Sequence, residues 1–326
     1  MSTTRSPRFG SLQFWPRVRA KREYARIRKW PVSGEAKISG FAGYKVGMTH
    51  IILTDNRQNS LTKNSDISFP VTVVECPPIK AISIRFYKNT NDGLKIVSEL
   101  FSDSNDKELG RRLVLPKKKS EKELPTNFDF VRLLVHTQPK LTGIGKKKPE
   151  VFEVGIGGSK EQQISYAKEK LGKEIYIDEV FKEGQHFDIH AVTKGKGFQG
   201  PVRRFGISLR SHKSEKSVRN PGSLGAWNAQ GHIMWRVAHA GKMGYHLRTE
   251  YNKLILKIGK KAEEINVRGG YLNYGLVKNP YLLIKGSLPG ITKRIIRMSV
   301  SRRPNKKIPK EAPVIQYISL ESKQGN

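Results

Sequence analysis

The sequence lacks the features that indicate disulfide-stabilised, membrane-bound or secreted proteins. It contains 326 residues and one cysteine, Cys76, so a disulfide framework and a cysteine-based zinc site are excluded. No run of about 18 apolar residues is present, and the arginine-rich N-terminus has no apolar signal region. We therefore expect a cytoplasmic protein without a membrane partner, and a buried apolar thiol at Cys76.

Acidic residues are scarce as well. The chain has 61 lysines and arginines against 28 aspartates and glutamates, which gives a net charge of +33. A compact body with this excess repels itself, and a polyanion is the natural neutraliser. The hydrophobic content of 37% allows a core but leaves much of the chain outside it.

The two signs of charge are segregated along the chain, whereas an ordinary solvated surface mixes them. Residues 1–35, 194–253 and 285–310 hold nine, twelve and nine basic residues against two, two and no acidic ones. Residues 99–188 are nearly balanced, with seventeen basic and sixteen acidic residues. We expect the three basic stretches to lie against phosphates and the balanced stretch to face solvent.

The apolar pattern predicts a mainly β fold with an α+β insertion. Short β-branched runs such as GMTHIILTD, FPVTVVEC and KAISIRFYK predict the strands of the first half of a barrel. In the insertion, SKEQQISYAKEKLG predicts a helix capped by Ser159 and Gln162 and ended by Gly172. The expected parts are a basic arm (1–37), the first part of the barrel (38–98), the α/β insertion (99–180), a barrel strand (181–193), a central extension (194–253), the last part of the barrel (254–300) and a tail (301–326).

The central extension has almost no apolar run, but it contains nine glycines, four histidines and the aromatic residues Trp227, Trp235 and Tyr245. So long a stretch without its own core does not persist in a compact domain unless it is disordered or bound. Its glycines and aromatics favour the bound state. We interpret it as a segment that takes its shape from RNA.

The string GKGFQG at 195–200 matches the G-x-G-x-x-G dinucleotide fingerprint. Because Pro201 follows and no apolar helical period is present, we expect no helix there to hold a pyrophosphate. We favour glycines that let backbone amides approach RNA phosphates; a plain flexible loop is the alternative. The cations that would neutralise the phosphates are Lys194, Lys196, Arg203 and Arg204.

The histidines and tryptophans of the extension also fit RNA better than catalysis. The histidines, spaced by 20, 7 and 7 residues, match no zinc pattern, so we expect them to hydrogen-bond to phosphate or 2′-hydroxyl groups or to stack on bases. Trp227 lacks apolar neighbours and is predicted to stack on an unpaired base at a loop tip. A buried turn is the alternative, and it suits Trp235 better. The four histidines are His212, His232, His239 and His246.

Six segments carry a resemblance to a known family: GFAGYKVGMTH (40–50), KGKGFQGPVRRFGI (194–207), SHKS (211–214), GSLGAW (222–227), AGKMGYHLRTEYNK (240–253) and GGYLNYGLVKNPYLLIKGSLPG (269–290). Over nearly its whole length the chain resembles the universal large-subunit ribosomal protein three, in its archaeal and eukaryotic form. The resemblance implies a six-stranded translation-factor-like β-barrel interrupted by an α/β insertion, and a long irregular extension directed toward the peptidyl-transferase centre. It also implies binding to 23S-type rRNA early in subunit assembly, beside neighbouring large-subunit ribosomal proteins.

By position, the resemblance makes Trp227 the tryptophan at the tip of the extension and His212 a histidine in its basic part. The family commonly has His-Pro after this tryptophan, where this chain has Asn228 and Ala229.

We therefore predict a structural constituent of the large ribosomal subunit, not an enzyme, with no cofactor, metal or small-molecule substrate. An RNA-modifying or nucleotide-dependent enzyme would need a pocket with perturbed acids, a cofactor loop or a metal, and a DNA-binding protein would need a recognition helix or a zinc module. The residues predicted to contact RNA are Arg17, Arg19, Lys21, Arg22, Lys45, Lys194, Lys196, Arg203, Arg204, Arg210, His212, Lys213, Arg219, Trp227, Trp235, Arg236, Lys242, His246, Arg248, Lys253, Lys293, Arg294, Arg302 and Arg303.

Overall fold

The structure is a computed structural model that describes residues 11–31, 33–103, 106–114, 124–226, 228, 231–305, 309, 311–322 and 324. The chain divides into two compact units. The smaller unit comprises Met1–Arg22 and Val192–Leu247, and the larger unit comprises Glu23–Ala191 and Arg248–Asn326. The predicted extension therefore falls mostly in the smaller unit.

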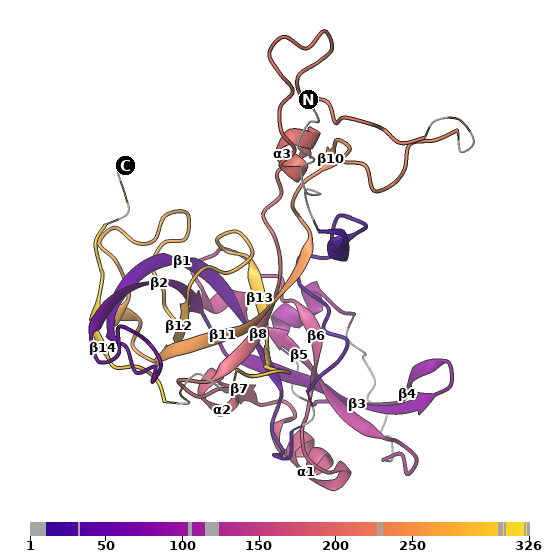
Figure 1. The fold of residues 1–326 in the computed structure, drawn as a ribbon. Coiled ribbons are helices and arrows are strands. Elements are labelled where there is room, and N and C mark those ends of the chain that lie inside the picture. Colours follow the sequence, from indigo (N-terminus) through magenta and orange to yellow (C-terminus); the bar gives the residue numbers. More distant parts are fainter. Residues whose placement is uncertain are drawn as a thin grey trace. The chain divides into compact units, whose positions relative to one another are not determined.

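The first sheet, which lies almost entirely in the larger unit, has seven strands (Figure 1). Their order is β13-β8-β11-β12-β2-β1-β14, and β13 also pairs with β1 in antiparallel register. Val71, Val73 and Val74 on β2 are fully buried, as expected for β-branched side chains on a pleated sheet. The strands are β1 (Gly40–Thr54), β2 (Asp66–Glu75), β8 (His186–Val192), β11 (Leu247–Gly259), β12 (Tyr281–Lys285), β13 (Ile295–Val300) and β14 (Ile315–Ile318).

The second sheet has five strands: β3 (Ile79–Thr90), β4 (Gly93–Phe101), β5 (Phe130–Thr137), β6 (Val151–Gly155) and β7 (Glu174–Ile175). Their order is β4-β3-β5-β6, and β7 pairs with β3. KAISIRFYK, predicted to form part of the first half of the barrel, lies in a different sheet from GMTHIILTD and FPVTVVEC. The segment lies in β3, which pairs with β4 and β5. Apolar alternation marks a strand but does not specify its partner.

The helices of the larger unit are short, and the longest confirms its prediction. Ser159 is the N-cap of this helix, α1; its backbone N–H donates to Gln162 Oε1 at 3.1 Å, and Gly172 follows the helix in a left-handed conformation, with φ of +76°. Ala167 on α1 is fully buried. The larger unit contains α1 (Lys160–Lys170), α2 (Ile177–Val180) and the 3-10 helices η2 (Lys107–Arg111), η3 (Pro139–Leu141) and η4 (Ala262–Glu264).

One apolar cluster contains side chains from both sheets, including Phe41 on β1 and Phe86 on β3. Tyr24, in the predicted irregular arm, also belongs to this cluster. Cys76 is buried there, and burial raises the pKa of its thiol, which confirms the predicted apolar thiol.

Arg297 on β13 is a fully enclosed cation of this core. Its Nη1 donates to the Ala25 carbonyl at 2.8 Å, and its Nη2 donates to the Glu153 carbonyl at 2.6 Å. The guanidinium carbon lies 4.1 Å from the centre of the Phe152 ring. Burial lowers the pKa of Arg297 to about 9. One side chain thus joins the arm, β13 and β6 through backbone carbonyls.

Glu75, at the end of β2, is a fully enclosed anion. It accepts hydrogen bonds from the Tyr274 hydroxyl, from the backbone N–H groups of Lys278 and Asn279 at 2.9 Å, and from the Asn279 side-chain amide at 2.7 Å. Burial and the nearby carboxylate raise the pKa of the Tyr274 hydroxyl. Glu75 therefore holds the irregular segment between η4 and β12 by satisfying its donors.

Replacing Glu75 with glutamine should lower the free energy of unfolding by about 1–3 kcal/mol, because the amide nitrogen faces donors and cannot accept from them. Urea unfolding of the RNA-free protein measures this change. Glu161→Gln, on the exposed first turn of α1, is the matched control and should stay within about 0.5 kcal/mol of the parent. Equal losses in the two variants would contradict the role of Glu75.

Candidate nucleic-acid interface

Two segments of the smaller unit pair to form a neck at the base of the extension. Thr193 N–H donates to the His246 carbonyl and Lys196 N–H to the Met243 carbonyl, each at 2.9 Å. Beyond these bonds, β9 (Phe198–Gln199) pairs with β10 (Gly241–Lys242) in antiparallel register. The extension was predicted to be irregular throughout, and the neck is a regular part of it.

Gly244 is required by the geometry of this neck. Its φ is +75°, and a Cβ at this position would lie 2.0 Å from the Lys194 carbonyl oxygen, which is backbone and cannot move aside. Only glycine satisfies both restrictions without distorting the pairing.

Residues 18–20 of the N-terminal arm are attached to this neck. Ala20 N–H donates to the Tyr245 carbonyl at 2.8 Å, and His246 Nδ1 is 2.8 Å from the Val18 carbonyl oxygen, a distance at which a protonated Nδ1 donates. The Arg19 guanidinium lies 5.4 Å from the centre of the Tyr245 ring. His246, predicted to contact RNA, is 7% exposed, so its ring serves the attachment of the arm.

Aromatic side chains form a second attachment of the N-terminal arm, around the short helix α3 (Pro201–Phe205). Trp15 stacks on Phe205 with ring centres 5.5 Å apart, and it forms a T-shaped pair with Trp235 with ring centres 5.4 Å apart. The Arg17 guanidinium lies 4.1 Å from the centre of the Phe205 ring. Trp15 and Phe205 were missed by the sequence analysis, although both are aromatics beside arginines in basic segments.

Two predicted RNA-contacting arginines use their guanidinium groups inside the smaller unit. Arg17 Nη1 donates to the Arg204 carbonyl at 2.9 Å. Arg204 donates from Nη1 to the His239 carbonyl at 2.9 Å and from Nε to the Lys242 carbonyl at 3.1 Å. Burial lowers the pKa of the Arg204 guanidinium below its ordinary value. These contacts fix the two side chains through carbonyl oxygens.

Two expectations about the extension were wrong. A helix does follow GKGFQG: α3 begins at Pro201 and is followed by Gly206 in a left-handed conformation, which fits the preference for proline at the first helical position and glycine after the last. This helix has five residues, and the preceding Lys196–Gln199 backbone pairs within the neck. Trp235 is 64% exposed, so a buried turn does not describe it.

Several predicted RNA-contacting cations of the smaller unit are exposed and form no ion pair with a residue that the structure describes. We call six of them the extension cations: Lys194, Lys196, Arg203, Lys213, Arg219 and Lys242. His212 and Arg236 in the extension and Arg19, Lys21 and Arg22 in the arm are also exposed.

The distal part of the extension has little regular structure among its described residues. Arg210 is the exception, because its backbone N–H donates to the Val218 carbonyl at 3.0 Å and its Nη2 donates to the Pro221 carbonyl at 2.7 Å. Trp227 and Ala229, which the resemblance singled out, lie outside the described residues.

The predicted RNA-contacting residues of the larger unit differ in their contacts and in their exposure. Lys45 Nζ donates to the Leu288 and Gly290 carbonyls at 2.6 and 3.2 Å, and burial lowers its pKa. The Lys293 side chain is exposed, while its backbone N–H donates to the Lys45 carbonyl at 2.8 Å. Arg294 is partly buried. The Lys45 side chain therefore forms hydrogen bonds inside the protein, whereas it was predicted to contact RNA.

The other four predicted RNA-contacting residues of the larger unit also differ in their contacts. Lys253 pairs with Glu250 at 2.7 Å, and Arg302 donates to the Lys29 carbonyl. The Arg303 guanidinium lies 5.6 Å from the Tyr251 ring centre, and Arg248 is partly buried, which lowers its pKa.

Within the described part of the chain, no three histidine, cysteine, aspartate or glutamate side chains gather in a way that could hold a metal ion. No described helix has the length and apolar character needed to cross a membrane.

Comparisons with known proteins agree over the whole chain. A family model described as "Ribosomal protein L3" matches residues 1–325. Proteins named large ribosomal subunit protein uL3 are similar in Archaeoglobus fulgidus, at 48% identity, and in Methanobrevibacter smithii, at 46%, each with 98% of both chains covered. The uL3 of Methanothermobacter thermautotrophicus is 46% identical with both chains fully covered. The chain therefore belongs to the ribosomal protein L3 family.

Proposed function

We propose that this protein binds rRNA directly through its smaller unit and thereby acts as a structural constituent of the large ribosomal subunit. Its family makes it a structural component of the ribosome in the cytoplasm and not an enzyme, as the sequence analysis expected. The observation that carries the proposal is the set of extension cations, which are exposed and have no described carboxylate partner.

The contrast with the larger unit supports this proposal. There, Arg85 pairs with Glu99 at 2.9 Å and with Glu153 at 2.7 Å, and Arg132 pairs with Glu153 at 3.1 Å. These two cations are neutralised by carboxylates of the same chain. The extension cations require anions from elsewhere, and the phosphates of a folded RNA supply them.

The attachment of the arm to the neck supports a preorganised interface. Trp15 and Arg17 hold the arm against Phe205, so the exposed arm cations do not have to be ordered entirely at the moment of binding. Trp235 presents an exposed indole that can stack on an unpaired base.

We also propose that the six strands β1, β2, β12, β11, β8 and β13 form the translation-factor-like barrel that the resemblance implies. The support is that β13 pairs with β1, so the first and the last of these six strands are also paired with each other. The further proposals, that the rRNA is of the 23S type, that binding is early in assembly and that the extension reaches toward the peptidyl-transferase centre, rest on the resemblance.

Changing Lys194, Lys196 or Lys242 to glutamine should weaken binding to an rRNA domain and reduce the salt dependence of that binding. Each lost phosphate contact lowers the slope of log affinity against log salt by about 0.7–0.9. Filter binding at several potassium chloride concentrations measures the slope. Lys168→Gln, at an exposed position on α1, is the control and should leave the slope unchanged. Unchanged slopes in all three extension variants would refute the proposal.

Trp15→Ala should weaken rRNA binding by about tenfold while leaving the salt slope unchanged, because it removes the aromatic attachment of the arm and no charge. The same titrations measure both quantities. Val18→Ala, whose side chain is 63% exposed, is the control and should bind like the parent. A Trp15 variant with parental affinity would show that the attachment of the arm does not contribute to binding.

A further inference from the structure

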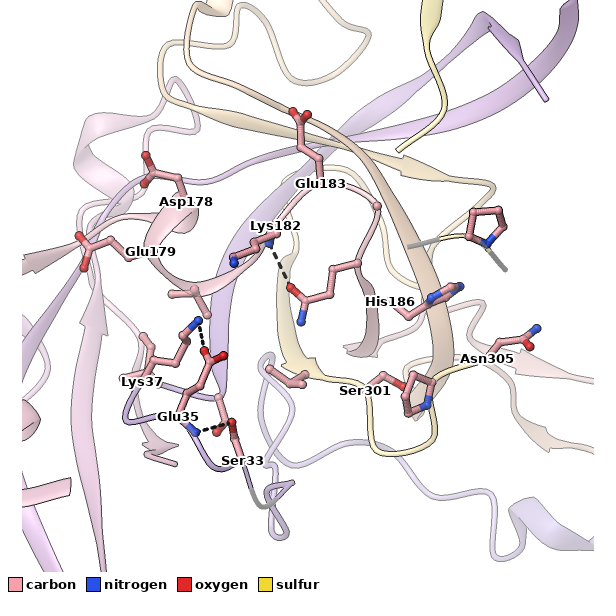
Figure 2. A pocket seen from close by; sticks show the side chains of 18 residues that line it. Ser33, Glu35, Lys37, Asp178, Glu179, Lys182, Glu183, His186, Ser301 and Asn305 are labelled. Atoms are coloured by element: carbon pink, nitrogen blue, oxygen red, sulfur yellow. Dashed lines mark hydrogen bonds and ion pairs between the residues drawn. The ribbon is translucent and has the colours of Figure 1, made fainter. Parts of the chain in front are cut away.

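A cavity of about 810 Å³ lies in the larger unit (Figure 2), and the charges around it offset one another. Four carboxylates and two lysines line it. Asp178 and Glu179, two of these carboxylates, pair at 2.9 and 2.6 Å with two further lysines outside the lining, Lys260 and Lys170. The charge of this cavity therefore selects no ligand, whereas the neck of the smaller unit carries charge that is not offset.

The two short strands of the neck, β9 and β10, have two faces of different character. In their antiparallel register Gln199 is opposite Gly241, and Phe198 is opposite Lys242. Side chains directly opposite each other lie on the same face, and consecutive residues of a strand lie on opposite faces. Arg204 covers the face of Gln199 and Gly241, because a Cβ on Gly241 would lie 2.8 Å from Arg204 Nη1. The chain thus fills one face of the neck with its own side chain.

The other face, which carries Phe198 and Lys242 and which we call the Phe198 face, is open. The Phe198 side chain is 74% exposed, and Lys242 is exposed as well. The stretches 194–214 and 216–249, which contain both strands, have no aspartate or glutamate. A single exposed apolar side chain is common on protein surfaces, so the ring alone indicates little. Its place opposite an exposed lysine, in stretches without acids, distinguishes it.

Gly200 extends this open surface. Its backbone is extended, with φ of −69° and ψ of 167°, so its missing side chain lies on the same face as that of Phe198, two residues earlier. Other residues adopt this φ, and a Cβ here would meet no described atom within 4 Å apart from its chain neighbours. The fold itself therefore does not require glycine at this position. The close approach of a molecule from outside the chain would require it.

A nucleotide is the kind of molecule that matches these three groups. Its base presents a flat π-face to the ring of Phe198, and its phosphate carries a negative charge for Lys242. An apolar protein segment would cover the ring but leave the lysine without an anion. An acidic segment would pair with the lysine but bring nothing flat to the ring. Because the base faces of a duplex are already stacked, the nucleotide has to be unpaired.

We propose that the Phe198 face binds one unpaired nucleotide of the rRNA. The base stacks on the Phe198 ring, a neighbouring phosphate pairs with Lys242, and the absence of a Cβ at Gly200 lets the sugar–phosphate backbone approach the chain. Every base has a π-face, so this site selects an unpaired nucleotide and not a particular base. The inference rests on the proposed binding of rRNA and adds to it a stacking residue, Phe198, that was not predicted from the sequence.

Phe198→Leu and Phe198→Tyr test the stacking, because leucine keeps an apolar side chain without a ring and tyrosine keeps the ring. Phe198→Leu should lower the affinity for an rRNA domain by about tenfold and leave the salt slope of the parent unchanged, since no charge is lost. Phe198→Tyr should bind like the parent. Filter binding at several potassium chloride concentrations measures both quantities, and urea unfolding checks that the variants fold. Phe101→Leu, at a 51% exposed position on β4, is the matched control and should bind like the parent.

Two results would overturn the stacking site while leaving the proposed function intact. Parental affinity of Phe198→Leu would mean that this face meets something other than rRNA, such as a protein segment. An equal loss in Phe198→Leu and Phe198→Tyr would mean that a closed apolar contact was removed and not a stacked ring. A parent protein that binds the rRNA domain without a steep salt slope would contradict the proposed function and this site together.

Gly200→Ala and Gly200→Ser test the approach of the RNA backbone. Each should weaken rRNA binding by about fivefold, because the new side chain occupies space that the nucleotide needs. Gly200 is also the N-cap of α3, a position at which serine is a good capping residue and alanine a poor one. Recovery of parental affinity in the serine variant would trace the loss to capping and overturn the proposed approach, as would parental affinity in both variants. Gly110→Ala on η2 is the control, since a Cβ there also meets no described atom within 4 Å, and it should bind like the parent.

Discussion

A shortage of apolar side chains governs the smaller unit. Of its described residues between 194 and 245, Phe205 is buried, while most lysines and arginines are exposed. A segment of this composition cannot obtain its shape from a core, so it uses backbone pairing at the neck and a few aromatic contacts instead. The remaining positive charge is left unneutralised by the chain itself. In a member of the ribosomal protein L3 family, this is the arrangement expected of a surface that is completed by RNA.

The larger unit, by contrast, has an extensive apolar core, and this core encloses two charged side chains. Arg297 donates to two backbone carbonyls and faces an aromatic ring, and Glu75 accepts from two backbone N–H groups, an amide and a hydroxyl. Neither is paired directly with a charge of opposite sign in these contacts. Each instead holds one segment that has little regular secondary structure of its own: the arm at Ala25 for Arg297, and the segment between η4 and β12 for Glu75. Buried charge here fixes the path of the chain where strand pairing is absent.

The strands and the helix of the larger unit could be predicted locally, because β-branched alternation and the Ser159–Gln162 capping pattern are encoded by neighbouring residues. The partner of β3 could not, since pairing depends on contacts distant in sequence. The use of Lys45 and His246 inside the fold was missed for a related reason: a basic residue in a basic segment looks the same whether its donor meets a phosphate or a carbonyl. The aromatic attachment of Trp15 to Phe205 joins residues 190 positions apart, and no local pattern reveals it.

Arg17 and Arg204 illustrate the effect of anchoring a guanidinium on carbonyl oxygens. A carboxylate partner would fix such a group but cancel its field, whereas a carbonyl fixes it and leaves the full unit charge in place. Both side chains thus act as immobile point charges whose position is set before any nucleic acid arrives. A lysine in place of Arg204 would retain the charge, but it lacks the planar fork that reaches the His239 and Lys242 carbonyls at once and so would lose the rigidity.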